Sequence, residues 1–230
     1  MNNVIRSYVF GVDVDGSTNT TIAGNDLIGN SVTGIGVEDS PGTKILFNVA
    51  RRNEVLGIFL AGTQQANAKV VGNNISGGAF GIFVTDVHRG SFAGNTVHGN
   101  CEGMVFEAFP SQPVGDFEVK SNTVENNTRS CRAAQFDRNV SGIGIALLGA
   151  NGMEVTANHL SGNVPSGPTR ISVVVAVDPY VEGAPKPTNN SVIANHFGPN
   201  KPDIFWDESG SGNRFVGNLC NSSVPSSLCN

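Results

Sequence analysis

The sequence has little charge. Only 14% of its 230 residues are Asp, Glu, Lys or Arg, against roughly 25% in an average globular protein. Such a chain has few charges for the polar faces of long amphipathic helices. The 14 Lys and Arg residues are scattered, and the formal net charge is -5. We therefore expect no nucleic-acid partner and no anionic membrane partner, because both need a basic surface patch.

Long apolar runs are also missing. No stretch approaches the roughly 18 apolar residues that cross a bilayer, so we expect no membrane insertion. The first ten residues, MNNVIRSYVF, lack the basic and apolar regions of a secretory signal. They begin in the middle of the repeat described next, which predicts that an upstream N-terminal part precedes Met1.

Leucine is sparse, but glycine is abundant, with 29 residues. A repeat organises the chain, and its anchor is an Asn with an aliphatic or aromatic residue three positions before it. A further apolar residue usually follows two positions after the anchor. The intervals between anchors are 22 to 27 residues, with two longer ones of 36 and 37. The anchors are Asn25, Asn48, Asn73, Asn95, Asn122, Asn158, Asn195 and Asn218.

A second Asn usually follows five residues after the anchor, and Gly78 takes this place in the third copy. Next comes a strand with strict alternation, such as Gly81-Ile82-Phe83-Val84, whose period of two buries Ile82 and Val84 on one face. Repeats this long cannot pair as hairpins. Stacked as coils, equivalent residues lie about 4.8 Å apart, and each strand pairs in parallel with its copy. A leucine-rich repeat is the alternative, but leucine and helical segments are too few.

The pattern resembles the right-handed parallel β-helix repeat proteins, the pectate-lyase-like superfold, over roughly Val4 to Leu219. The resemblance implies an all-β fold: a single right-handed parallel β-helix (solenoid) of about nine coils, with three short strands per coil. One domain would cover residues 1–230. The two long intervals between anchor asparagines imply insertions at 128–139, 164–170 and 178–188. Inserted loops in this architecture usually form the sides of a binding groove.

The four cysteines pair naturally in stacked coils. Cys101 and Cys131 follow the equivalent corner of adjacent coils, which brings them within disulfide reach. Cys220 and Cys229 would close residues 220–230 as a C-terminal cap. Four free thiols are the alternative, and no Cys/His cluster indicates zinc. The cysteines favour an oxidising, extracellular or periplasmic (secreted) location.

The outward residues of the Gly-Ile-x-Val strands should form two neighbouring rows along the solenoid. The first row is Asp13, Gly36, Phe59, Phe83, Val105, Gly144, Val174 and Phe205. The second row is Asp15, Glu38, Ala61, Thr85, Glu107, Ala146, Ala176 and Asp207.

Acidic residues gather in the first two coils: Asp13, Asp15, Glu38 and Asp39. We expect Asp15 and Glu38 to be stacked neighbours about 5 Å apart. Carboxylates this close repel, so one takes up a proton or both share a cation. Three interpretations stay open: a solvated acidic face, a Ca²⁺ site formed by all four residues, or a catalytic pair, since a spacing near 5 Å suits retaining glycoside chemistry.

A second candidate site lies at one corner of the fourth coil. Asp86, His88 and Arg89, with Glu107 one coil on, could bind a uronate and abstract its proton. The alternative is a polar corner in which Asp86 simply pairs with Arg89.

Exposed aromatic residues form the third candidate: Phe59, Phe83 and Phe205. They could stack on sugar rings or meet a protein partner, unless an insertion covers them. Separately, His159 and His196 follow their anchor Asn on adjacent coils, so we expect a stacked imidazole pair.

The motifs of polygalacturonase-like members of the superfold are absent, and Asp178-Pro179-Tyr180 is the string nearest to the Asp-Pro-His of mannuronan epimerases. Two hypotheses follow. The first is a secreted protein that binds, and through its candidate residues modifies, a polysaccharide as a lyase, epimerase or hydrolase. The second is a non-catalytic structural or adhesion scaffold that binds a protein. The ligand and the oligomeric state cannot be read from the residues.

Overall fold

A computed structural model describes residues 2–62, 67–133, 138–166, 173–176 and 181–229 as a solenoid of parallel β-strands. The only helical element in these ranges is a short 3-10 helix, η2 (Ser226–Leu228). Asp178-Pro179-Tyr180 and parts of the three predicted insertions lie outside the described residues. No helix in the described ranges is long and apolar enough to cross a membrane.

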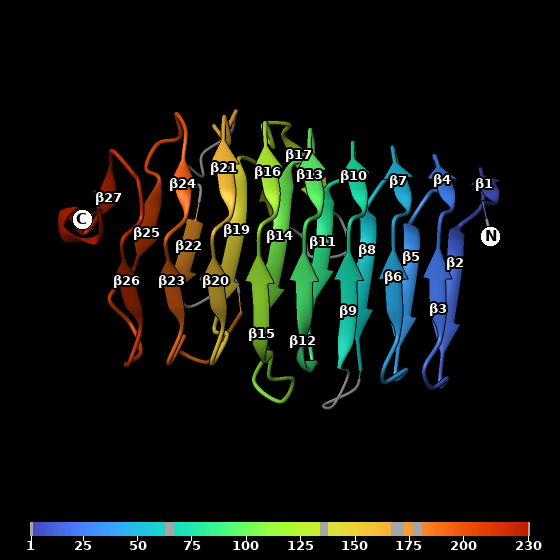
Figure 1. Cartoon of the computed structure of the whole chain (residues 1–230), viewed down its shortest axis with the longest axis horizontal. Coiled ribbons are helices and arrows are strands. Elements are labelled where there is room, and N and C mark those ends of the chain that lie inside the picture. Colours follow the sequence, from blue (N-terminus) through green and yellow to red (C-terminus); the bar gives the residue numbers. More distant parts are fainter. Residues whose placement is uncertain (1, 63–66, 134–137, 167–172, 177–180, 230) are drawn as a thin grey trace.

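Three parallel sheets run along the solenoid, and each coil contributes one strand to each sheet (Figure 1). Sheet A consists of β1 (Val4–Arg6), β4 (Asp26–Ile28), β7 (Val49–Arg51), β10 (Asn74–Ser76), β13 (Thr96–His98), β16 (Thr123–Glu125), β21 (His159–Ser161) and β24 (His196–Phe197). Sheet B consists of β2 (Phe10–Asp15), β5 (Thr33–Glu38), β8 (Leu56–Ala61), β11 (Phe80–Val84), β14 (Glu102–Glu107), β19 (Ile143–Leu148), β22 (Val173–Ala176), β25 (Ile204–Trp206) and β27 (Ser223–Val224). Sheet C consists of β3 (Thr21–Ala23), β6 (Lys44–Leu46), β9 (Ala68–Val71), β12 (His88–Ala93), β15 (Gly115–Lys120), β20 (Glu154–Thr156), β23 (Ser191–Ile193) and β26 (Arg214–Val216).

This architecture confirms the predicted parallel β-helix of about nine coils with three strands per coil. Alternation along the strands places one set of apolar side chains inside the solenoid, where they form its main core. In the middle coils the core is aromatic: the rings of Phe92 and Phe106 meet edge to face with their centroids 5.1 Å apart, and Phe117 lies 5.3 Å from Phe92. The inner face is thus filled by side chains and leaves function to the outer surface and the corners.

The anchor asparagines stack in a continuous column at the corner between sheets C and A. In each step, Nδ2 of one Asn donates to Oδ1 of the Asn in the next coil, at 2.9 to 3.1 Å. The same Oδ1 also accepts the backbone N–H of the preceding Asn, as in Asn122 to Asn158 at 2.9 Å. These buried amides satisfy the corner backbone, which explains the strict spacing of Asn in the sequence.

The second Asn column is present but interrupted. Asn30 donates to Asn53 at 2.8 Å, and Asn100 donates to Asn127 at 3.0 Å. Between them, Gly78 has no side chain to receive a bond from Asn53, and only its backbone N–H reaches Asn100 Oδ1, at 3.0 Å.

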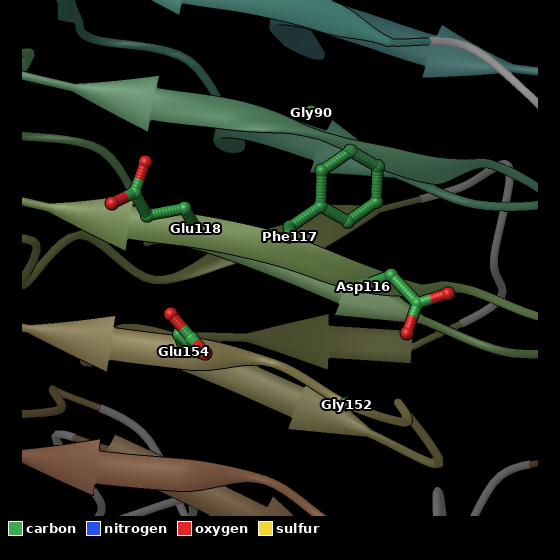
Figure 2. Close-up of a pocket in the computed structure, with 6 residues that line it drawn as sticks. All are labelled: Gly90, Asp116, Phe117, Glu118, Gly152 and Glu154. Carbon is green, nitrogen blue, oxygen red and sulfur yellow. The ribbon is translucent and has the colours of Figure 1, made fainter.

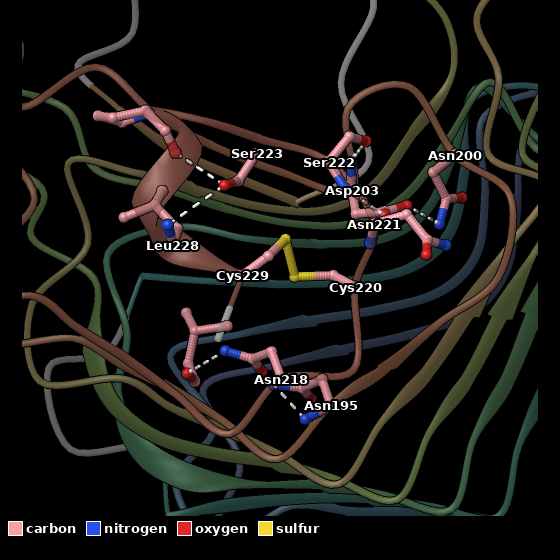
Figure 3. The surroundings of a disulfide bond; sticks show 12 residues. Asn195, Asn200, Asp203, Asn218, Cys220, Asn221, Ser222, Ser223, Leu228 and Cys229 are labelled. Carbon is pink, nitrogen blue, oxygen red and sulfur yellow. Dashed lines mark hydrogen bonds between the residues drawn. A yellow bond between two sulfur atoms is a disulfide. The ribbon is translucent and has the colours of Figure 1, made fainter.

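Both predicted disulfides form, Cys101–Cys131 and Cys220–Cys229. The second closes the C-terminal coil beside η2 (Figure 3). Next to it, the buried Asp203 accepts hydrogen bonds from the backbone N–H groups of Asn221 and Ser222, at 2.8 and 3.1 Å. The cap is therefore held by a covalent bond and by a buried carboxylate.

One predicted alignment is wrong. Glu102 pairs in register with Ile143, so Gly103 lies opposite Gly144 rather than Gly142. Ala146, not Gly144, therefore follows Val105 in the first outward row, and Leu148, not Ala146, follows Glu107 in the second. A slip of two residues keeps every side chain on the same face, so the alternating pattern alone could not reveal it.

Candidate functional site

The acidic group lies on the outer face of sheet B, in the first two coils. Asp15 and Glu38 are register partners on β2 and β5, which confirms that they are stacked neighbours. Their side chains are exposed, as are those of Asp13 and Asp39. The pKa of Glu38 is raised, first by partial burial and then by the negative charges of Asp13, Asp15 and Asp39. This carboxyl group therefore holds its proton more firmly than an isolated Glu.

Calcium binding by these four residues stays a prediction. In the described part of the chain, no three His, Cys, Asp or Glu side chains are grouped so that they could hold a metal ion. A cation here would need further oxygen ligands, since Ca²⁺ takes six to eight.

Asp86 lies at the corner that follows sheet B, with a left-handed backbone (φ 53°). Asp39 has a similar φ of 43° at the same corner, two coils earlier. The pKa of Asp86 is raised, first by burial and then by the negative charge of Asp39, whereas His88 lowers it. The carboxyl group of Asp86 is thus placed where ionisation is disfavoured, as in many general acids and bases.

Two neighbouring oxygens at this corner have no hydrogen-bond partner within the described part of the chain. They are Thr85 Oγ1 and Asp86 Oδ1, both shielded from solvent. Thr85 is only 8% exposed. Buried polar atoms are nearly always paired, so each exception calls for an explanation. Arg89 does not supply the missing partner, because it is exposed and no ion pair joins it to Asp86 within the described ranges. The alternative in which Asp86 simply pairs with Arg89 is therefore not observed.

His88 connects this corner to the next coil. Its Nδ1 lies 3.5 Å from Asp116 Oδ2, and its charge acts on Asp86. Sequence reasoning missed Asp116, which follows the register partner of His88, Gly115. Only the strand register of sheet C could have indicated it, since Asp116 belongs to no Gly-Ile-x-Val strand.

Glu107, the last residue of β14, is 1% exposed. Val84 pairs with Phe106, so Thr85 and Glu107 are adjacent in the second outward row. The structure therefore brings Thr85, Asp86, His88 and Glu107 to one corner, while Arg89 points to solvent there.

The sequence predicted an exposed aromatic row, and the structure corrects this for Phe83. Phe83 is 1% exposed, and Phe59 and Phe205 are partly buried. They belong to a second apolar cluster on the outer face of sheet B, against which Cys131 packs. Cys131 lies in β17 (Cys131–Ala133), which pairs antiparallel with β18 (Arg138–Val140) within the first insertion. Cys131 of the first insertion packs against this second cluster, so the insertion contributes to its cover.

A shallow hollow of about 350 Å³ lies on the outer face of sheet C (Figure 2). Its lining consists of three carboxylates, Asp116, Glu118 and Glu154, together with Phe117, Gly90 and Gly152. Glu118 is paired with Lys120 Nζ at 2.6 Å. The hollow begins at Asp116, next to His88, and so continues the corner site along the surface.

The family comparison agrees with this geometry. The family model described as a right handed beta helix region matches residues 10–219, so the chain belongs to the right-handed β-helix family. No curated protein matches the chain.

Three solved structures share the fold at low identity. DFA-IIIase from Arthrobacter chlorophenolicus A6, in complex with GF2, has a TM-score of 0.71 at 16% identity over 94% of this chain and 54% of its own. The periplasmic alginate epimerase AlgG (T265N mutant) has a TM-score of 0.68 at 15% identity over 94% and 49%. PfbA, a surface adhesin of Streptococcus pneumoniae, has 0.50 at 15% over 87% and 45%. The chain spans about half the length of these proteins.

Proposed function

We propose that this protein binds a polysaccharide and modifies it by proton transfer at the corner formed by Thr85, Asp86, His88 and Glu107. The observation that carries the proposal is the pair of unpartnered oxygens, Thr85 Oγ1 and Asp86 Oδ1, in one protected corner. Sugar hydroxyl groups both donate and accept hydrogen bonds, so they are suitable partners for such oxygens.

Asp86 is the proposed general acid or base. Its raised pKa brings the carboxyl group closer to the operating pH, where proton transfer is most effective. His88, between Asp86 and Asp116, would adjust the charge of the corner. Arg89 is exposed at the edge and would be free to meet the carboxylate of an acidic sugar.

The substrate class rests on the structural relatives. One is an alginate epimerase and another is DFA-IIIase in complex with GF2. A lyase, epimerase or hydrolase of a polysaccharide follows from that likeness. The two disulfides and the periplasmic epimerase support an extracellular or periplasmic location. In this proposal Asp15 and Glu38 form a second acidic subsite farther along the solenoid, with or without Ca²⁺.

A non-catalytic adhesion scaffold is the second candidate. The burial of Phe83 favours it, because a covered aromatic row cannot serve as a platform for sugar rings. The adhesin PfbA shares the fold. In this case, a protein partner would bind the outer surface and no glycan would be converted.

The test is a glycan array followed by turnover assays on alginate, pectate, fructans and glucans, reading new reducing ends, unsaturated uronates and epimerised residues. We expect one glycan class to bind and react. Asp86→Asn should lower turnover by about 100-fold or more, whereas Asp26→Asn, a carboxylate paired with Arg51 on sheet A, should not. Glycan binding without turnover would overturn the proposed proton transfer, and no glycan binding at all would overturn the carbohydrate role and favour the protein-binding scaffold.

A further inference from the structure

The outer face of sheet A carries a pair of histidines that the proposed function does not use. His159 on β21 and His196 on β24 are register partners in adjacent coils. Their Nδ1 atoms lie 3.0 Å apart, and the rings are inclined by only 15° with centroids 5.1 Å apart. The predicted imidazole pair is therefore present, with the two rings meeting through their nitrogen-bearing edges.

The tautomer of His159 follows from its second nitrogen. Glu125 Oε1, on the neighbouring strand β16, lies 3.5 Å from His159 Nε2 and also accepts a hydrogen bond from Ser161 Oγ at 3.4 Å. A carboxylate at this place favours a proton on Nε2. The Nδ1 of His159 then presents a lone pair toward His196, so the atom shared between the two Nδ1 positions is a single proton.

Histidines that bind metals in proteins usually donate one ring N–H to a carboxylate and use the unprotonated second nitrogen as the ligand. Glu125 and His159 have this arrangement. We propose that His159 and His196 form a two-imidazole site for a divalent transition-metal ion such as Zn²⁺ or Ni²⁺. The ion replaces the proton between the Nδ1 atoms, and Glu125 acts as a positioning residue. Borderline ions of this class prefer imidazole nitrogen, whereas Ca²⁺ and Mg²⁺ prefer oxygen.

The spacing requires only a small adjustment. Two metal–nitrogen bonds of about 2.0–2.1 Å at a tetrahedral angle place the nitrogens about 3.3 Å apart. The side chain of His159 is 44% exposed and His196 is also exposed, so both rings can turn to aim their lone pairs at one ion. No third His, Cys, Asp or Glu of the described chain joins them, so water fills the remaining positions.

Such an ion would link two coils. β21 and β24 belong to the coils that precede the C-terminal cap, and the metal would hold them together as the disulfide holds the last coil. Because the ion binds the folded pair and not two distant imidazoles in an unfolded chain, it should raise the temperature of unfolding.

The test is calorimetric titration of the full, tag-free chain with ZnCl₂ and NiCl₂, with CaCl₂ as the hard-ion control, followed by thermal unfolding with and without metal. We expect saturable one-to-one binding of Zn²⁺ and Ni²⁺ by His159 and His196, a higher unfolding temperature with Zn²⁺, and no Ca²⁺ binding that depends on either histidine.

Variants locate the site. His159→Gln and His196→Gln should each abolish binding and the thermal shift, while Glu125→Ala should weaken binding by about tenfold. The matched control is His98→Gln, since His98 is also on sheet A but contacts Asn74 instead of a histidine. The proposal is overturned if the wild-type chain shows no saturable binding, if the His159→Gln/His196→Gln double variant still binds, or if His98→Gln loses binding equally.

Discussion

The carboxylate of Asp39 lies over Gly62, and its negative charge acts on Asp86 in the coil after Gly62, where burial first and this charge second raise the pKa of Asp86. Val84 pairs with Leu60, and Glu38 with Ala61, so Asp39, Gly62 and Asp86 succeed one another at the same corner. A β-carbon on Gly62 would come within 2.9 Å of Asp39 Oδ1. The absence of a side chain at Gly62 thus leaves room for the carboxylate of Asp39.

Asp86→Asn should stabilise the protein at neutral pH. A raised pKa means that the folded state binds the proton more tightly than the unfolded chain does. Stability is therefore lost as the pH rises through the interval from about 4 up to the raised pKa, and the loss is complete above it. Urea unfolding at a series of pH values should show the variant above wild type at pH 7 and equal to it below about pH 4. For comparison, Asp26→Asn removes an exposed ion pair with Arg51, and solvent screening makes such a pair nearly neutral, so stability should change little at any pH.

Gly62→Ala should destabilise the fold more than Gly16→Ala, although both glycines follow a sheet B strand and are left-handed, with φ values of 82° and 59°. Each substitution carries a backbone cost of roughly 1–2 kcal/mol. At Gly16 no described atom lies within 4 Å of the added β-carbon, whereas at Gly62 the carboxylate of Asp39 must move. Chemical denaturation of both variants measures the difference, and equal losses would show that Asp39 moves aside at no cost.

Asn122→Ala should lower the free energy of unfolding by roughly 3 kcal/mol or more. Asn122 Oδ1 accepts from the backbone N–H and from Nδ2 of Asn95, and its own Nδ2 donates to Phe92 O and Asn158 Oδ1, all at 2.9 Å. Each buried group left without a partner costs about 1–3 kcal/mol. Asn74→Ala is the control, because Asn74 is exposed and should change stability by about 0.5 kcal/mol at most. A small effect at both positions would contradict a structural role for the column.

Asp203→Ala should loosen the C-terminal cap before the rest of the solenoid. The substitution removes the acceptor of the Asn221 and Ser222 amides and of Asn200 Nδ2, which lies 3.2 Å from Oδ1. Hydrogen exchange should therefore accelerate at these two amides, while the anchor column up to Asn158 keeps its protection. Unchanged exchange at Asn221 and Ser222 would mean that the Cys220–Cys229 bond alone holds the cap.

The fold was readable from the sequence because the same chemical requirement recurs in every coil. A buried Asn must pair with its copy above and below, so its spacing records the length of each coil directly. The exception lies in the coil with the first insertion, where Gly142 and Gly144 both fit the strand pattern. Only the cross-strand pairing of Glu102 with Ile143 decides between them.

The candidate site was only partly readable. The adjacency of Asp15 and Glu38 follows from the repeat alone and is confirmed. Phe83 is buried in a second apolar cluster against which Cys131 of the first insertion packs, and an insertion has no repeat from which its path can be deduced. The lack of a hydrogen-bond partner for Thr85 Oγ1 in the described chain appears only in the folded structure. A sequence shows which groups can form hydrogen bonds, but not which of them remain without a partner.

Gly78 creates a junction between two coils that should be mechanically weaker than its neighbours. Among the described residues, the junction between β5 and β8 has two hydrogen bonds to an Asn Oδ1 of the second column, the junction between β8 and β11 has none, and the junction between β11 and β14 has only the one from the Gly78 backbone N–H. Because a stack of coils is held together by the contacts of each coil with its neighbours, a chain pulled from its two ends should part first at this junction.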